Sequence, residues 1–329
     1  MRTRLDFVPP EAAIGEPACL IVVGRADRLR EADVQGHLPP DVAELWRAML
    51  EAAAPGDTGA CTGTHRTTAP LRVSVAVLPE ACSRHNSPAR PHAITELVRA
   101  QVPAEGTATV LIALDDATHA VAAACAVARC LPAYDRKSGP STERAVRVAF
   151  LADQKIDVER VAVIAEATRA AARLVDMPAS ELDTAAFVDV ARDTAARLED
   201  VEITVLEGEE LGAGGFGGLW GVGKAATHGA ALVLLEHTPG AIGPHSKTIC
   251  IVGKGIVYDT GGLSLKGRDH MPGMKGDMGG AAAVLGAFTA AVRLGTRHRL
   301  HALLCLAENA VGPAAIRPDD ILAMYSGKT

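Results

Sequence analysis

Short apolar runs alternate with longer amphipathic stretches along this chain, and no other feature limits its fold as strongly. The apolar runs are typical of buried β-strands, and they are Cys19–Val23, Leu71–Leu78, Ala108–Leu114, Arg147–Leu151, Val201–Leu206, Ala231–Leu235, Thr248–Val252 and Leu300–Leu306. The stretches with helical periodicity are Asp41–Ala52, His92–Gln101, Thr118–Cys130, Val158–Val175, Thr184–Leu198 and Gly280–Leu294. This alternation predicts an α/β protein with largely parallel sheets.

A polar stretch with Pro and Gly between residues 131 and 157 interrupts this pattern. At roughly 100–200 residues per domain, a chain of 329 residues has room for two domains. We therefore predict an N-terminal α/β domain over residues 1–157 and a second α/β domain, with a mostly parallel central sheet, over residues 158–329. Within the first domain, residues 52–70 are rich in Gly, Thr and Pro and are predicted to form a surface loop.

The composition disfavours several classes of partner. A net charge of −6 and only five Phe, three Tyr and two Trp argue against nucleic acid, which needs basic patches and stacking rings. No run approaches the roughly 18 consecutive apolar residues of a membrane span. The seven cysteines form no CxxC pair, and the N-terminus lacks the apolar run of a signal peptide. We therefore expect a cytoplasmic protein with reduced thiols and with neither nucleic-acid nor membrane partners.

Two glycine-rich segments in the second domain resemble nucleotide-binding motifs. Residues 212–217 match GxGxxG after a predicted strand, but the helix that would hold a pyrophosphate is not expected to follow. Residues 218–225 are one residue short of a P-loop, because Ala225 stands where Ser or Thr would bind magnesium. A glycine-rich turn packed close to a sheet is the simpler interpretation, and nucleotide binding stays an alternative.

The segment 252–280, VGKGIVYDTGGLSLKGRDHMPGMKGDMGG, has the composition of a functional loop. It follows a predicted strand and precedes a predicted helix, and open α/β sheets place their sites at such strand ends. Its carboxylates suit hard metal ions, and nine glycines let the backbone approach a ligand closely. Lys254 follows an apolar strand and is expected to be half-buried, where a lysine with a lowered pKa can ligate a metal or act as an acid. An ordinary solvated loop is the alternative.

The same segment closely resembles the signature of the leucyl aminopeptidase (cytosol aminopeptidase) family. Four residues stand at the family's spacing, and they are Lys254, Asp259, Lys266 and Asp277. The words DTGG and DMGGAAAV around them also match, as do TRAAARLVDMP from Thr168 and ENAVGPAAIRPDDI from Glu308. The resemblance is strong over residues 158–329 and covers the first half by architecture. It is greatest to the aminopeptidase-like branch found in animals.

The resemblance implies a metalloaminopeptidase that uses two divalent ions, zinc or manganese, to hydrolyse N-terminal residues from peptides. Lys254, Asp259 and Asp277 would be metal ligands, with Asp259 bridging the two ions. Asp277 would also face the free amine of the substrate, and Met274 would line the pocket for its first side chain. Lys266 would be catalytic, stabilising the oxyanion that develops at the scissile carbonyl. The family assembles as hexamers, so a homo-oligomer is expected.

One part of the family pattern lies beyond this sequence. In the family, the remaining metal-binding carboxylates stand in an Asn-Thr-Asp-Ala-Glu-Gly-Arg word soon after a Ser-Gly-Lys-Thr stretch, and this sequence ends at Ser326-Gly327-Lys328-Thr329. Asp259 and Asp277 bring two negative charges to a pair of divalent ions, so we expect the chain alone to bind them poorly. We therefore expect this chain to be the N-terminal portion, or a short isoform, of a metalloaminopeptidase. We expect the chain to be inactive on its own. The alternative is a noncatalytic truncated isoform that acts in assembly or partner binding.

Overall fold

The computed structural model describes residues 2–13, 17–56, 58–136, 138, 142–241, 243 and 245–329. The chain divides into two compact units, residues 1–169 (unit 1) and 170–329 (unit 2). This division falls inside helix α6 (Val158–Asp176), whereas the sequence-based boundary lies where that helix begins. The domain limits 1–157 and 158–329 therefore stay a prediction.

Unit 1 is built around a six-stranded sheet, sheet A, with strands in the order β1-β6-β5-β2-β4-β3. Every neighbouring pair is parallel except β3 and β4. The strands are β1 (Arg2–Phe7), β2 (Cys19–Arg25), β3 (Ala60–His65), β4 (Arg72–Leu78), β5 (Gly106–Ala113) and β6 (Glu143–Leu151). The helices are α1 (Pro10–Ala13), η1 (Arg28–Arg30), α2 (Ala32–Gln35), α3 (Pro40–Ala52), α4 (Pro91–Gln101), η2 (Ala117–His119) and α5 (Ala120–Cys130).

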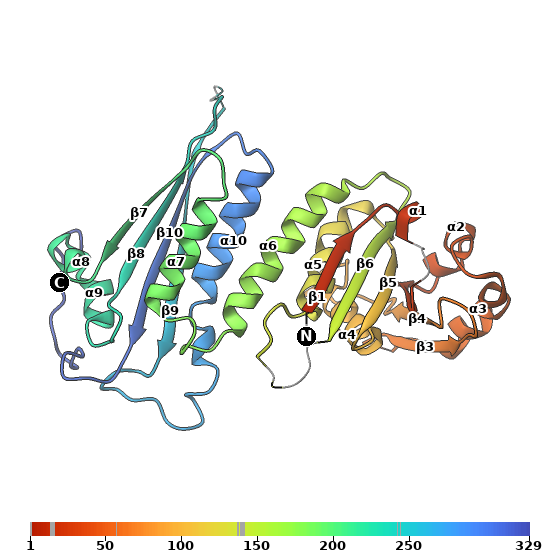
Figure 1. Cartoon of the computed structure of the whole chain (residues 1–329), viewed down its shortest axis with the longest axis horizontal. Helices are drawn as coiled ribbons and strands as arrows, with labels where there is room; N and C mark the ends of the chain where they lie inside the picture. The colour runs from red at the N-terminus through yellow and green to blue at the C-terminus, as the bar shows by residue number, and fades with distance from the viewer. Residues whose placement is uncertain are drawn as a thin grey trace. The chain divides into compact units, whose positions relative to one another are not determined.

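Helices cover both faces of sheet A (Figure 1). Alternate residues of β2 therefore enter two different cores: Ile21 packs on the side of α4 and α5, and Val22 packs on the side of α3. Trp46 of α3 is buried and donates its indole N–H to the carbonyl of Leu29 at 2.7 Å. Burial on both faces explains why the central strands are continuous apolar runs.

Strand β3 corrects the sequence analysis, which predicted a loop over residues 52–70. The strand lies at the edge of sheet A, and its residues alternate between half-buried and exposed. It pairs with β4 alone, antiparallel, so that Cys61 lies opposite Ala76. An edge strand with one covered face needs few apolar side chains, and the sequence ACTGTH has no apolar run to reveal it.

Unit 2 contains a four-stranded sheet, sheet B, in the order β7-β8-β10-β9. Its elements are α7 (Thr184–Ala195), β7 (Val201–Glu207), α8 (Glu209–Ala213), α9 (Gly217–Gly223), β8 (Ala231–His237), β9 (Thr248–Asp259), η3 (Met274–Gly276), α10 (Gly279–Arg293) and β10 (Arg299–Asn309). Helices α7 and α10 cover one face, where Phe187 and Phe288 are fully buried, and α8 and α9 pack against part of the other (Figure 1). The α/β fold class is thus confirmed.

The strand directions in sheet B differ from the expected mostly parallel sheet. Strands β9 and β10 are parallel, but β8 is antiparallel to both β7 and β10. The reason is local: the Gly208 amide, just after β7, donates to the Ala230 carbonyl, just before β8, at 2.9 Å. The chain therefore starts β8 at the end of the sheet where β7 stops, whereas a parallel neighbour needs a crossover to the opposite end.

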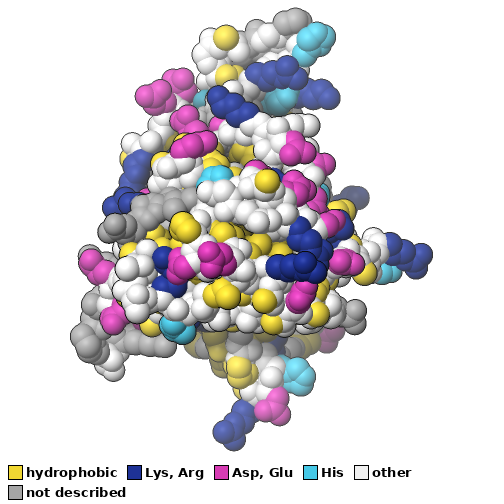
Figure 2. Space-filling model, turned by 90° about the vertical axis from the view of Figure 1, so that its right-hand side faces the viewer, with side chains coloured by type: hydrophobic (Ala, Val, Ile, Leu, Met, Phe, Trp, Pro, Cys, Tyr) yellow, Lys and Arg dark blue, Asp and Glu magenta, His cyan; other side chains and the backbone are white. Residues whose placement is uncertain are grey.

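Acidic and basic side chains are interspersed on the face of the molecule that Figure 2 shows. None of the described helices has the length and apolar character that a membrane crossing requires.

Candidate active site

The structure brings the five residues singled out in the sequence into two groups, Lys254 with Asp277, and Lys266 with Asp259 and Met274. Lys254 and Asp259 belong to β9, which extends to Asp259 and so occupies the first part of the segment predicted as a loop. Lys266 lies in the loop that follows, Met274 begins η3, and Asp277 stands just before α10. All five come from one continuous stretch of chain folded back on itself.

Lys254 pairs with Asp277. The Lys254 Nζ donates to Asp277 Oδ1 at 2.8 Å, and the Lys254 side chain is 61 % exposed. The expected half-burial is therefore wrong. The neighbouring Gly253 and Gly255 face α10, so the side chain of Lys254 points away from that helix, and β9 is an outer strand of the described sheet.

A close crossing of α10 over β9 brings this pair together. A Cβ added to Gly253 would lie 2.6 Å from the Ala281 Cα, and one added to Gly280 would lie 3.0 Å from the Lys254 backbone nitrogen. Backbone therefore meets backbone with no side chain between them. The start of α10 is fixed against β9 at Lys254, and Asp277 lies directly before that start.

Lys266 pairs with Asp259. The Lys266 Nζ donates to Asp259 Oδ2 and also contacts the Met274 Sδ at 3.2 Å. The side chains of Asp259 and Lys266 are 19 % and 28 % exposed, so this pair is better shielded than the first. Burial alone raises the pKa of Asp259, but the hydrogen bonds that it accepts, led by that from Lys266, outweigh burial and hold the pKa below its usual range.

The sequence analysis assigned no role to Asn309, although this residue completes the surroundings of Asp259. Its side-chain amide donates to Asp259 Oδ1 at 2.8 Å from the end of β10. The only signal in the sequence was its place in the ENAVGP word.

The donor chemistry of this cluster fits part of a metal site. Carboxylate oxygens are suitable ligands for divalent ions, and Asp259 and Asp277 each already face a lysine ammonium. However, no group of three His, Cys, Asp or Glu side chains among the described residues is placed to hold an ion. Asp259, Asp277 and Lys254 thus fit as an incomplete set of ligands.

A short helix, α9, follows the first nucleotide-like segment and contains most of the second, which corrects the prediction that no helix follows residues 212–217. The glycines of α9 allow close packing: a Cβ on Gly217 would lie 2.1 Å from the Ala323 carbonyl oxygen, and one on Gly223 would lie 2.6 Å from the Ala230 Cβ. Lys224 lies over the Trp220 ring, 5.1 Å from its centroid. These contacts give the glycines a packing role that needs no phosphate.

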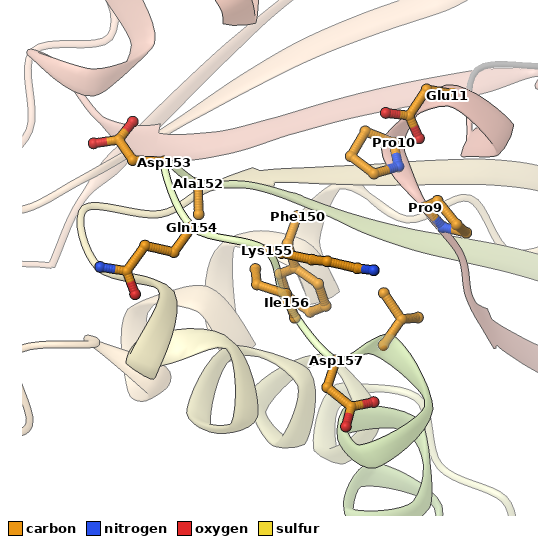
Figure 3. A pocket seen from close by; sticks show the side chains of 11 residues that line it. Pro9, Pro10, Glu11, Phe150, Ala152, Asp153, Gln154, Lys155, Ile156 and Asp157 are labelled. Atoms are coloured by element: carbon orange, nitrogen blue, oxygen red, sulfur yellow. The ribbon is translucent and has the colours of Figure 1, made fainter.

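A cavity of about 750 Å³ in unit 1 is separate from this cluster (Figure 3). It lies past the ends of β1 and β6 and is lined by residues 9–11 and by residues 150 and 152–158. The five candidate residues all belong to unit 2 and none lines this cavity. We place the candidate chemistry in unit 2, because the pairs Lys254–Asp277 and Lys266–Asp259 lie there.

Glu308 forms a separate acidic group with Asp183. Burial, and then the nearby charge of Asp183, raise the pKa of Glu308, while His228, which lies 3.3 Å from Asp183, partly offsets them. The pKa of Glu308 is higher in the folded chain than in the unfolded chain. The ionised carboxylate therefore destabilises the fold at pH values above the folded-state pKa, and this effect disappears at pH values below the unfolded-state pKa.

We expect Glu308→Gln to be more stable than the wild type near pH 8 and to lose this advantage as the pH falls through the raised pKa. Urea unfolding at a series of pH values measures the difference. Glu202→Gln, at an exposed position of the same sheet, is the control. An advantage for Glu308→Gln that is constant from pH 4 to pH 8 would contradict the prediction.

Comparisons with known proteins identify the family of this chain. Residues 169–329 match the catalytic domain of the cytosol aminopeptidase family, and residues 18–140 match the M17 aminopeptidase N-terminal domain 2. The chain belongs to the M17 cytosol aminopeptidase family. Both units of this M17 protein are covered by these matches.

Individual relatives of this M17 chain support the assignment. Probable aminopeptidase NPEPL1 of Mus musculus is 44 % identical over 94 % of this chain, and leucine aminopeptidase 1 of Caenorhabditis elegans is 36 % identical over 94 %. Leucyl aminopeptidase from Leishmania major, solved with actinonin, superposes with a TM-score of 0.90 at 31 % identity over 99 % of this chain and 65 % of its own. The bottromycin maturation enzyme BotP, solved with Mn, has a TM-score of 0.71 at 31 % identity over 94 % of this chain and 63 % of its own. The chain spans 60 % of the mouse relative and 63 % of the nematode one.

Proposed function

We propose that this protein acts as a metal-dependent aminopeptidase that removes N-terminal residues from peptides. The observation that carries the proposal is the formation of two lysine–carboxylate pairs by residues of β9 and of the segment that leads from it to α10. Family membership supports the reaction class, and the BotP structure with Mn supports a divalent metal.

In this proposal Lys254, Asp259 and Asp277 hold a pair of zinc or manganese ions, together with ligands from elsewhere in the whole protein. When bound, such ions polarise the scissile carbonyl and supply a hydroxide nucleophile at neutral pH. The resulting enzyme is a cytoplasmic homo-oligomer, with the hexamer of the family as the expected form.

The chain's own side chains bind and orient the peptide. Asp277 faces the free α-amine of the substrate, because a carboxylate attracts that positive charge and selects a free N-terminus. Met274 contributes an apolar wall for the first side chain. Lys266 carries a positive charge held between Asp259 and Met274, close to where negative charge develops on the scissile oxygen.

A noncatalytic role in assembly or partner binding is the second candidate. It is favoured by the incomplete ligand set among the described residues.

A direct assay separates the two candidates. The chain is tested on leucine amide with added Mn²⁺ or Zn²⁺, alone and fused to the C-terminal portion of the mouse relative that it does not span. Hydrolysis by either form, lost on Lys266→Ala, supports the aminopeptidase. A fusion that is folded and binds Mn²⁺ but does not hydrolyse any N-terminal amide would contradict it.

A further inference from the structure

We infer that Asn309 is a positioning residue of the proposed metal site, which holds the Asp259 carboxylate in one orientation through its side-chain amide. This inference rests on the proposed function for its metal-related part. Its structural part concerns only the contacts of Asp259 and is tested separately.

The two oxygens of Asp259 have different partners. Oδ1 accepts two N–H donors, the Gly261 amide at 2.9 Å and the Asn309 Nδ2 at 2.8 Å. Oδ2 accepts from the Lys266 ammonium. Two donors converging on Oδ1 fix the plane of the carboxylate and direct Oδ2 toward the lysine. Partners of this kind orient metal-binding carboxylates in other proteins.

The backbone of Asn309 is held independently of its side chain. The parallel pairing of β9 and β10 shifts register between Ala307 and Glu308, and the shift brings Asn309 opposite Asp259. Its carbonyl accepts hydrogen bonds from both the amide and the hydroxyl of Thr260, the amide at 3.1 Å. A change confined to the side chain therefore leaves the strand contact in place.

The space around the side chain limits what can replace it. Gly262 has φ +59°, and a Cβ there would lie 2.8 Å from the Asn309 Oδ1. The amide oxygen thus faces Gly262 while the amide nitrogen faces Asp259. The close approach of Gly262 limits the space for a larger side chain at position 309.

Two variants with the same pattern of branching test the role of the amide donor. Asn309→Leu keeps the branching and removes the donor, and Asn309→Asp puts an acceptor and a negative charge against Asp259. Asn86→Asp makes the same charge change at an exposed position of unit 1 and serves as the control. Asn309→Ala replaces Asn309→Leu if the latter does not fold.

The first measurement needs no metal and follows amide hydrogen exchange. Because repulsion turns Asp259 away, the Gly261 amide loses its acceptor in Asn309→Asp and exchanges about 10–100-fold faster than in the wild type. The increase is smaller in Asn309→Leu and absent in Asn86→Asp. Amides of β8, such as that of Val233, keep their wild-type rates. Unchanged exchange at Gly261, or a uniform increase that includes β8, would overturn the inference.

The second measurement is Mn²⁺ affinity, from the electron paramagnetic resonance signal of free Mn²⁺. Asn309→Leu is expected to bind about 10–100-fold more weakly than the wild type, with an unchanged midpoint of urea unfolding. Equal affinity in the two proteins overturns the metal-related part. A wild-type protein that binds no Mn²⁺, either as this chain or as the fusion, contradicts the proposed function instead, and exchange at Gly261 then decides the role of Asn309.

Discussion

In whichever form hydrolyses leucine amide, the chain alone or the fusion, Lys266→Ala is expected to lower kcat by about 10²–10³-fold. This is the usual effect of removing one group that stabilises an oxyanion. KM is expected to change little, because the interaction strengthens only as charge develops on the carbonyl oxygen. The ammonium of Lys266 contacts both Asp259 and Met274, so its removal takes away a positive charge paired with the half-buried Asp259 carboxylate. Initial rates over a range of substrate concentrations give both constants.

The metal content of the variant distinguishes catalysis from metal binding. Lys266→Ala removes an ammonium that pairs with Asp259, so the bound Mn²⁺ is expected to stay at the wild-type level. Lys247→Ala, at an exposed position of the same unit, is the control and is expected to keep full activity. A variant that loses activity together with its metal would show that Lys266 supports the ion rather than the oxyanion.

Gly253→Ala is expected to lower the free energy of unfolding of unit 2 by about 1–3 kcal/mol, the usual cost of overpacking. The added methyl group would lie 2.6 Å from the Ala281 Cα and 2.7 Å from the Gly280 carbonyl oxygen. Both are backbone atoms, so no rotamer change can relieve the contact and α10 must move. Because Asp277 precedes that helix, its pairing with Lys254 is expected to weaken as well.

The two tryptophans allow this effect to be measured in unit 2 alone. Trp46 lies in unit 1 and Trp220 in unit 2, so in a Trp46→Phe background the fluorescence reports unit 2 during urea unfolding. Gly267→Ala is the matched control, since a Cβ there meets nothing closer than 3.7 Å. Equal midpoints for the two alanine variants would mean that the crossing is looser than the structure indicates.

The sequence predicted most of the strands, including the edge strand β7, but missed β1, β3 and the second half of β9. Strands β2, β4 and β5 are mostly apolar because helices cover both sides of sheet A. Strand β3 is an edge strand with alternating exposure, and β9 continues through Gly253 and Gly255, where close packing replaces apolar side chains. The strand directions in sheet B were also predicted wrongly. The direction of β8 depends on the end of the sheet at which the connection from β7 leads into it.

The sequence places the candidate residues close together along the chain, but their contacts in space could not be predicted from it. Asp259, Lys266 and Asp277 fall in one stretch of sequence whose spacing is distinctive, and a local pattern is enough to find them. Asn309 reaches Asp259 only through the pairing of β9 with β10, which no local pattern encodes. The exposure of Lys254 depends on its strand lying at the outer side of the described sheet.

The crossing of β9 and α10 divides this region into two kinds of position for directed evolution. An added carbon at Gly253, Gly255 or Gly280 meets neighbouring backbone at 3.0 Å or less, so substitutions at these positions are expected to destabilise unit 2. The side chains of Leu263 and Leu265, in contrast, lie in the loop after β9 and are 48 % and 62 % exposed. A library of variants in this region is best directed to residues of that loop, with the three glycines kept unchanged.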